Sequence, residues 1–339
     1  MSQLSRATNK PSIQDVARLA GVSAQTVSRV ARDAPNVKES TKTRVLLAMD
    51  QLKYVPNRAA RALRSGQYST LGVITQNLGR TGESLITAGI AAEAEERGYS
   101  VSLRQISHPG TEELTQAGSY FSHHTVDGLI VVQAGSATIP HSLSHGTPTV
   151  VSDSRFINNF SSAVTDQVQG TRLVVEHLLD LGHTRIAHIA GPTESPSANI
   201  RQTVWQSTLE EAGLPLGPIM YGNWSAQSGY KAALALAEKS HVTAIFAAND
   251  EMAFGAMRAL YEKGVRLPAD ISIAGFDDIA LAEYSVLPLT TVRQNFETIG
   301  RTLTDLVIAR IAAPTAPIEQ RVIPSELIVR ASTGPRPTA

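Results

Sequence analysis

Short apolar segments alternate with longer segments of helical periodicity along most of this chain, from Leu71 onward. Seven segments of four or five residues have the composition of buried strands: 71–75, 101–104, 128–132, 148–151, 186–190, 244–248 and 271–275. Between several of them, apolar residues recur at helical spacing in the segments 84–97, 167–181, 198–212, 225–239 and 250–263. Such alternation is typical of parallel sheets covered by helices on both faces. We therefore predict an α/β core of two such sheets, one in each of two subdomains.

The composition limits what this core can be. The 339 residues contain no cysteine, which excludes a disulfide scaffold, a thiolate metal site and a cysteine nucleophile. An apolar fraction of 42% with 18% charged residues fits globular domains and not wholesale disorder. The polar start of the chain lacks an export signal, and no apolar run is long enough to span a bilayer. We expect a cytoplasmic protein without a membrane partner.

The net charge of zero conceals a strong asymmetry. Residues 1–66 contain twelve Lys or Arg residues and four Asp or Glu residues, a net charge of +8, so the rest of the chain carries −8. A small basic unit joined to a larger acidic one indicates that the first unit binds a polyanion and releases its counterions.

The basic unit has the pattern of a helix-turn-helix. Ser12 is placed to cap a first helix, Gly21 to end it, and Ser23 to cap a second helix. A third helix, roughly 40–52, completes a three-helix core. The second helix has one apolar stripe, so its other face is free to enter the major groove of DNA. That face carries Ala24, Gln25, Ser28 and Arg29. Gln can pair with adenine and Arg with guanine.

Two stretches resemble the headpiece of the lac and gal repressor family, a family of bacterial transcriptional regulators. They are DVARLAGVSAQTVSRV at 15–30 and YVPNR at 54–58. The resemblance implies sequence-specific contacts with double-stranded operator DNA from Ser23, Ala24, Gln25, Ser28, Arg29, Asn36, Thr41, Tyr54, Asn57, Ala60 and Leu63. Ala24 stands where the lac repressor pattern has a tyrosine, so the operator preference is expected to differ.

The segment 57–64 follows Pro56 and forms only about two turns of helix, too few for stability alone in water. In the family that it resembles, this hinge helix orders on the operator, where an apolar residue, here Leu63, wedges between base pairs. Arg58, Arg61 and Arg64 are spaced to meet phosphates. The alternative is that Leu63 packs against the next domain.

Polar and aromatic residues follow the predicted strands of the core. In open α/β sheets, ligands bind beyond the carboxyl ends of the strands. Each of the residues given below could alone cap a helix or pack in a core. Together they provide carboxylates, amides, a guanidinium and flat aromatic rings. This is the set that a sugar with many hydroxyls needs. The residues are Asp153, Arg201, Trp224, Asn249, Asp250, Asp277, Asp278, Gln294 and Phe296.

The resemblance extends over about residues 11–335, and the segments 170–183, 222–229, 248–260, 269–278 and 288–296 resemble the lac repressor branch of the family. It implies a galactoside-like saccharide effector in a periplasmic-binding-protein-like core. The effector contacts that it implies are Gln76, Ile86, Asp153, Arg201, Trp224, Asn249, Asp277, Gln294 and Phe296. Gln76 and Arg80 depart from the small and apolar residues of the lac repressor pattern, which affects the identity of the sugar.

The resemblance also implies the domain organisation. We expect a headpiece at 1–56, a hinge helix and linker at 57–68, and a core at 69–335 that makes a homodimer. The first subdomain is expected at about 69–165 and 294–323, and the second at about 166–293 and 324–335. The chain stops without the leucine-rich helix that makes tetramers in the lac repressor.

Motifs of catalysis are missing from the sequence: it has no GxGxxG after a strand, no phosphate-binding GxxxxGK[ST], no HExxH and no GxSxG. His123 and His124 are neighbours on a predicted helix and do not share a face, so we expect no metal site and no cofactor. Of Asp277 and Asp278, only one is expected to face the cleft. We therefore predict a repressor that a saccharide releases, and not an enzyme. The alternatives are a regulator with a co-repressor, such as a purine base, or another metabolite as effector, and a transport-type sugar-binding protein.

Overall fold

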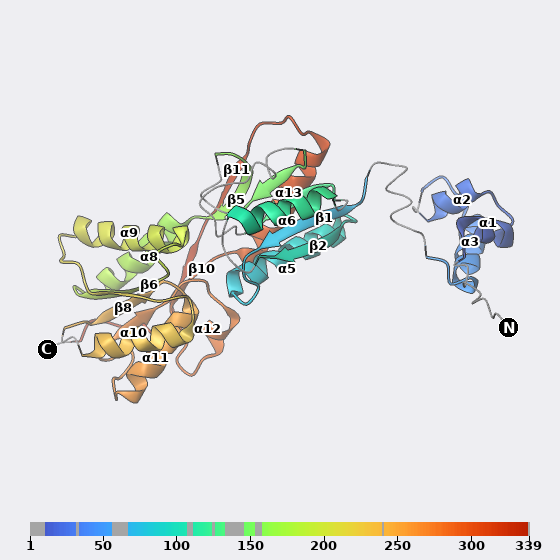
Figure 1. Ribbon diagram of the computed structural model, residues 1–339. Coiled ribbons are helices and arrows are strands. Elements are labelled where there is room, and N and C mark those ends of the chain that lie inside the picture. The colour runs from blue at the N-terminus through green and yellow to red at the C-terminus, as the bar shows by residue number, and fades with distance from the viewer. Residues whose placement is uncertain are drawn as a thin grey trace, which may run out of the picture. The chain divides into compact units, whose positions relative to one another are not determined.

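The computed structural model describes residues 11–31, 34–55, 67–106, 111–123, 126–132, 146–152, 158–238 and 241–337. The chain divides into two compact units, Met1–Tyr68 and Ser69–Ala339 (Figure 1). The first is the helical headpiece and the second is the α/β core.

The headpiece contains α1 (Ile13–Ala20), α2 (Ala24–Val30) and α3 (Glu39–Gln51). Local hydrogen bonds set the helix ends, as the sequence predicts. The Ser12 hydroxyl accepts from the Asp15 backbone N–H at 3.3 Å, and the Asp15 carboxylate accepts from the Ser12 N–H at 3.0 Å, which forms a capping box. Gly21 ends α1 with a φ of 64°, and the Ser23 hydroxyl caps α2 through the Thr26 N–H at 3.1 Å.

A small apolar core holds the three helices together. Val16, Val27 and Val45, one from each helix, are fully buried, and Met49 lies beside them. Tyr54 packs against the edge of this core. The apolar stripe of each helix is thus used for packing, and the opposite face of α2 stays on the surface.

The first sheet of the core has six parallel strands in the order β11-β5-β4-β3-β1-β2. They are β1 (Thr70–Thr75), β2 (Ser100–Gln105), β3 (Gly128–Val131), β4 (Thr149–Val151), β5 (Ser161–Thr165) and β11 (Gln320–Ile323). Successive buried residues face opposite sides. Val73 packs with α5 (Thr81–Glu96) and α13 (Phe296–Ala312), whereas Ile74 packs with α6 (Thr111–His123).

The second sheet has four parallel strands in the order β7-β6-β8-β9. They are β6 (Ile186–Ala190), β7 (Ile219–Tyr221), β8 (Ala244–Ala247) and β9 (Ser272–Ala274). One face is covered by α8 (Gln167–Asp180) and α9 (Pro196–Glu211), and the other by α10 (Ala226–Ala237) and α11 (Asp250–Glu262). A short helix, α12 (Ala280–Tyr284), follows β9. The predicted α/β architecture of two parallel sheets flanked by helices is confirmed (Figure 1).

The two subdomains are joined by segments that run from one sheet to the other. The chain leaves the first sheet after β5, returns through β10 (Thr291–Arg293) into α13, and leaves again after β11 through β12 (Glu326–Ile328). β10 and β12 pair as an antiparallel ribbon. Each subdomain is therefore built from separate parts of the chain.

A buried histidine lies in the second sheet. His188 on β6 is fully buried, and its ring stacks against Phe246 and Trp205 with centroids 4.8 and 5.3 Å away. Its Nδ1 donates to the Phe246 carbonyl oxygen at 2.9 Å, while Nε2 has no hydrogen-bond partner among the described residues. Burial lowers the pKa of His188 to about 4, so the ring is neutral at pH 7.

This histidine makes the stability of the core dependent on pH. Because the folded pKa is about 4 and the unfolded value is about 6.5, the unfolded state binds the extra proton first as pH falls. The contribution is complete above pH 6.5 and is lost towards pH 4, with a change of about 3 kcal/mol. We expect His188→Asn, which keeps a donor near the position of Nδ1, to remove most of this dependence in urea unfolding from pH 7 to 4.

His241 is exposed, and His241→Asn is the matched control, which should keep the wild-type pH dependence. An unchanged dependence in the His188 variant would contradict the assignment.

Candidate functional site

The surface of α2 is the candidate nucleic-acid interface. Gln25 and Arg29 are exposed, Ser28 is half-buried, and Ala24 packs partly against the headpiece core. The Ser23 hydroxyl is occupied as the helix cap, so any contact from it has to be made together with that role. Asn36 is exposed and Thr41 half-buried. The predicted hinge residues Asn57, Ala60 and Leu63 lie outside the described residues.

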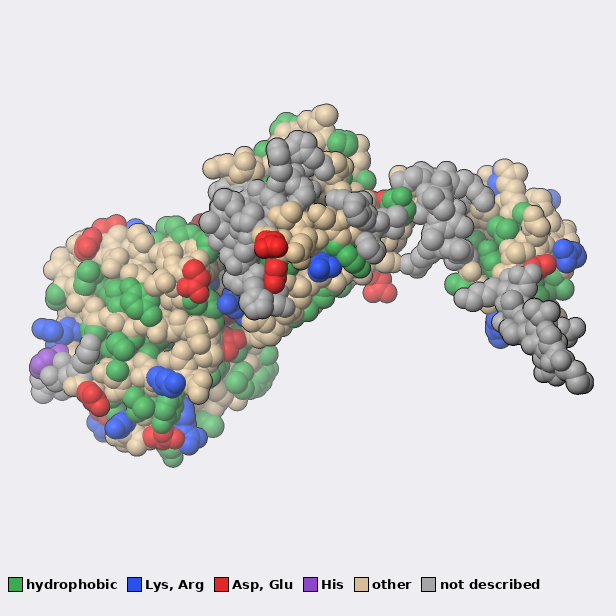
Figure 2. Space-filling model, in the orientation of Figure 1, with side chains coloured by type: hydrophobic (Ala, Val, Ile, Leu, Met, Phe, Trp, Pro, Cys, Tyr) green, Lys and Arg blue, Asp and Glu red, His purple; other side chains and the backbone are tan. Residues whose placement is uncertain are grey.

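The core does not share the positive charge of the headpiece. The face of the core visible in Figure 2 carries acidic and basic side chains interspersed rather than gathered in one patch. A surface of mixed sign attracts a polyanion only weakly. We therefore seek the candidate DNA surface on the basic unit, which carries the net positive charge.

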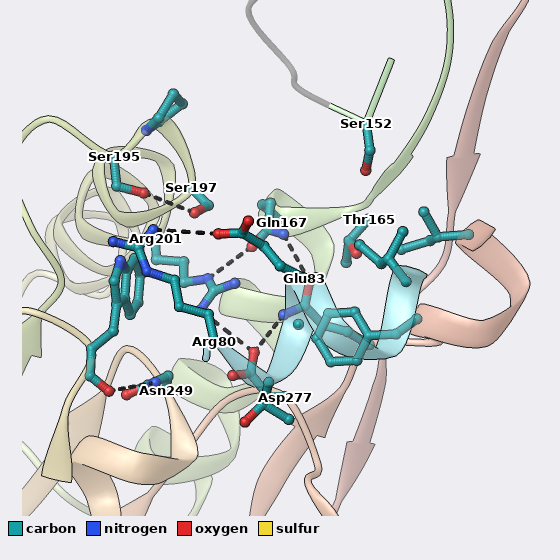
Figure 3. Close-up of a pocket in the computed structure, with 18 of the residues that line it drawn as sticks. Arg80, Glu83, Ser152, Thr165, Gln167, Ser195, Ser197, Arg201, Asn249 and Asp277 are labelled. Carbon is teal, nitrogen blue, oxygen red and sulfur yellow. Dashed lines mark hydrogen bonds and ion pairs between the residues drawn. The ribbon is translucent and has the colours of Figure 1, made fainter. Parts of the chain in front are cut away.

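A pocket of about 560 Å³ lies in the core, between the two sheets. Its walls come from the loop after β1 and the start of α5, the starts of α8, α9, α10 and α11, the segment after β9, and the start of α13 (Figure 3). These are the carboxyl ends of the parallel strands, where the topology predicts a ligand site.

Seven of the nine effector residues named from the sequence line this pocket: Ile86, Arg201, Trp224, Asn249, Asp277, Gln294 and Phe296. Gln76 is not among the lining residues; its backbone N–H donates to Glu83 Oε2 at 2.9 Å. Asp153 lies outside the described residues. Arg80, which departs from the family pattern, does line the pocket.

Four side chains of the pocket form a polar ring. Arg201 Nε donates to Gln167 Oε1 at 2.8 Å, Gln167 Nε2 donates to Gln294 Oε1 at 3.0 Å, and Gln294 Nε2 donates to Asp277 Oδ1 at 2.5 Å. The ring closes where Asp277 Oδ1 lies 3.9 Å from Arg201 Nη1. Figure 3 shows three of them, Arg201, Gln167 and Asp277, close together on one part of the pocket wall.

Arg201 is the most buried charge of this ring, with 4% of its surface exposed. Its Nη1 also donates to the Ala248 carbonyl oxygen, and its guanidinium carbon lies 3.8 Å from the ring centre of Phe276. Burial lowers the pKa of Arg201 to about 10, against the opposing effect of Asp277 and Asp250. The guanidinium therefore stays charged at pH 7.

The two adjacent aspartates after β9 point in different directions, as expected. Asp277 faces the pocket, and burial raises its pKa well above the usual range while Arg201 opposes the shift. Asp278 turns away and binds Arg293 and Arg330, each at 2.7 Å. Both residues have positive φ, 128° and 56°, which lets consecutive side chains diverge.

Two aromatic rings supply flat surfaces in the pocket. Trp224 has a φ of 72°, and its ring lies 5.6 Å from the guanidinium carbon of Arg201. A Cβ atom at Gly191 would lie 2.6 Å from the Trp224 ring, so the indole position requires glycine there. Phe296, at the start of α13, lines the pocket from the other subdomain. Such rings can stack on the C–H face of a sugar.

The predicted residue Asn249 contacts pocket residues that the sequence analysis did not name. Asn249 Nδ2 donates to the Trp224 carbonyl oxygen at 3.0 Å and to Glu251 Oε2 at 2.6 Å, while its Oδ1 caps α11. Glu251 Oε1 accepts from the Thr81 hydroxyl, at the start of α5 on the opposite subdomain. Gln167, Glu251 and Thr81 thus complete the walls.

Glu83 organises the first subdomain's side of the pocket. Its Oε2 accepts from the Thr75 hydroxyl at 2.6 Å and from the backbone N–H groups of Gln76 and Asn77 at 2.9 and 2.7 Å. Its other oxygen, Oε1, lies 3.7 Å from Arg80 Nη1. The carboxylate therefore fixes the loop after β1.

Neither a metal site nor a membrane span is found in the part of the chain that the structure describes. No group of three His, Asp or Glu side chains there could hold a metal ion. His124 lies outside that part. No described helix is both long enough and apolar enough to cross a bilayer.

The polar ring allows a direct test of the buried ion pair. Arg201→Met removes the cation and leaves Asp277 buried without it, so we expect a loss of about 3 kcal/mol of unfolding free energy at pH 8. The loss should be smaller at pH 5, because a proton on Asp277 then replaces the missing cation. Urea unfolding at both pH values measures this.

The matched control is Arg172→Met, which breaks an ion pair with Glu211 that is more than one-third exposed on both sides. It should cost at most about 1 kcal/mol at either pH. Equal losses for the two variants would contradict the structural role of Arg201.

Comparisons with known proteins agree with this arrangement. A family model described as bacterial regulatory proteins, lacI family, matches residues 12–57, and one described as periplasmic binding protein-like domain matches residues 175–333. The chain is 35% identical over 325 residues to the lactose operon repressor of Escherichia coli K12, covering 95% of this chain and 90% of that protein. It is 33% identical to the ribose operon repressor of the same strain, covering 89% and 94%.

A solved structure is similar over nearly the whole chain. It is the lac repressor dimer bound to operator and the anti-inducer ONPF, with a TM-score of 0.85 and 34% sequence identity. The match covers 96% of this chain and 100% of that one. Headpiece and core are therefore both accounted for by one known architecture.

Proposed function

Because the chain belongs to the lacI family of bacterial regulatory proteins, we propose that it represses transcription by binding an operator and that a galactoside-like saccharide in the core pocket releases it. The lactose and ribose operon repressors that it matches are named as repressors, and other relatives are named as transcriptional regulators. We place its action in the cytoplasm, on chromosomal DNA. The single observation that carries the effector half of the proposal is the polar ring of Arg201, Gln167, Gln294 and Asp277.

The DNA half rests on α2. Its buried stripe fixes the helix to the headpiece, and its exposed Gln25 and Arg29 are available for base edges in a major groove. The charge of +8 over residues 1–66 supplies the electrostatic part of the affinity. Two headpieces of a homodimer then read the two halves of a palindromic operator. We assign Asn57, Ala60 and Leu63 to contacts at its centre.

The saccharide half rests on complementary chemistry. Sugar hydroxyls both donate and accept, and the ring presents carboxylate, amide and guanidinium groups side by side. Trp224 and Phe296 offer aromatic faces to the apolar side of a sugar ring. A pocket built for hydroxyls rejects analogues that leave its buried polar groups unpaired.

Release follows from the position of the pocket between the subdomains. A saccharide that favours one arrangement of the subdomains shifts the equilibrium towards it and separates the two hinge segments of the dimer. Linkage then requires that the operator weaken saccharide binding by the same factor, typically about 5- to 150-fold.

The DNA contact is tested by Arg29→Ala. We expect the affinity for an operator from the chromosomal region around the gene to fall about 10- to 100-fold, with little change for unrelated DNA. Fluorescence anisotropy with labelled duplexes at two salt concentrations measures both. Arg185 is exposed on the core, and Arg185→Ala, the matched control, should keep wild-type affinity. Equal loss on all duplexes would mean that Arg29 contacts phosphate only.

The effector half is tested with lactose, galactose, cellobiose and ribose in the same assay. At least one should lower operator affinity, and Trp224→Ala should weaken the response to it by about tenfold while keeping operator affinity. A saccharide that tightens operator binding would show a co-repressor. No response to any of the four sugars would contradict the saccharide proposal.

A further inference from the structure

The cations on the pocket wall already lie beside anions. Arg201 is bound to Gln167 and the Ala248 carbonyl and lies 3.9 Å from Asp277, and Arg80 lies 3.7 Å from the buried carboxylate of Glu83. Neither guanidinium is thus free to bind an anionic group of a ligand without leaving a carboxylate uncompensated.

Glu251 is in the opposite situation. Its carboxylate lines the pocket, yet within the described residues its hydrogen-bond donors are two neutral groups, the Thr81 hydroxyl and the Asn249 amide. None of the ion pairs among those residues includes it. It stands in the first turn of α11, near the N-terminus of that helix.

The lining of the pocket therefore has an excess of negative charge. Even without Asp277, whose pKa burial raises, three carboxylates line it, those of Glu83, Asp166 and Glu251, against the two guanidiniums of Arg80 and Arg201. Like charges disfavour one another strongly where water is partly excluded. A phosphate or carboxylate on a ligand adds to this repulsion, whereas a hydroxyl can donate to the same oxygens.

Glu251 lies at a contact between the two subdomains that form the walls of the pocket. Thr81 starts α5 in one subdomain and Glu251 lies on α11 in the other, so their hydrogen bond joins the two walls of the pocket. A ligand that contacts both walls can replace this hydrogen bond with a donor of its own.

From these contacts we propose that Glu251 is a specificity-determining residue that restricts the effector to uncharged saccharides and excludes sugar phosphates and sugar acids. The inference rests on the proposed saccharide function and adds the class of sugar and the residue that selects it. A neutral side chain in place of Glu251 is therefore expected to reduce the preference for uncharged sugars over sugar phosphates and sugar acids.

The test compares matched pairs of probes by titration calorimetry on the full chain: galactose with galactose 6-phosphate, glucose with glucose 6-phosphate, and ribose with ribose 5-phosphate. The wild type should bind at least one neutral sugar at least ten times more tightly than its phosphate. Because salt screens charge repulsion, this ratio should shrink as the salt concentration rises.

Glu251→Gln keeps an oxygen for Thr81 and removes the charge, and it should reduce the ratio at least threefold. Glu95→Gln makes the same charge change on the exposed side of α5 and should leave the ratio as in the wild type. Circular dichroism checks the fold of both variants, and the salt series on the wild type tests the charge effect without any variant.

The outcomes separate the two proposals. A wild type that binds a sugar phosphate as tightly as the neutral sugar, or a ratio unchanged by salt and by Glu251→Gln, overturns the role of Glu251 and leaves the saccharide function in place. A wild type that binds none of the six probes overturns this inference, and if none of the four sugars changes operator affinity either, the saccharide function is overturned with it.

Discussion

The burial of one guanidinium organises the second subdomain and the pocket together. Arg201 cannot lie in an apolar sheet environment unless its donors find acceptors, and those acceptors come from α8, from the end of β8 and from the turn after β9. Phe276 covers its flat face. Placing this side chain therefore requires that several distant segments be in position, and the same segments carry the groups that face a ligand.

The crossover between subdomains completes this arrangement. Gln294 follows β10, where the chain passes from the second sheet into α13, and it joins Gln167 to Asp277. The polar ring thus includes a residue whose position depends on how the subdomains are joined. On the other side of the pocket, the Thr81–Glu251 bridge depends on the same geometry. A molecule bound between these contacts lies against groups that both subdomains hold in place.

Much of the fold could be predicted from sequence because it is local. Caps such as Ser12 and Ser23 act within three residues, and the seven apolar runs fall on strands of the two sheets. The strands β7, β10, β11 and β12 lack a continuous run of buried apolar residues, and β5, α6, α12 and α13 were not recognised either. In the pocket, Gln167 and Thr81 were missed because their partners are 34 to 170 residues away, and only the tertiary fold brings them there.

The divergence of Asp277 and Asp278 has a mechanical consequence. One peptide unit separates a carboxylate on the pocket wall from one that binds Arg293, on β10, and Arg330, just after β12. Between the two there is no pliable segment in which a small displacement could dissipate. Through the ion pairs of Asp278 with Arg293 and Arg330, the backbone beside the pocket is therefore tied to the ribbon that joins the subdomains. Ligand contact and subdomain connection thus meet at two consecutive residues of one turn.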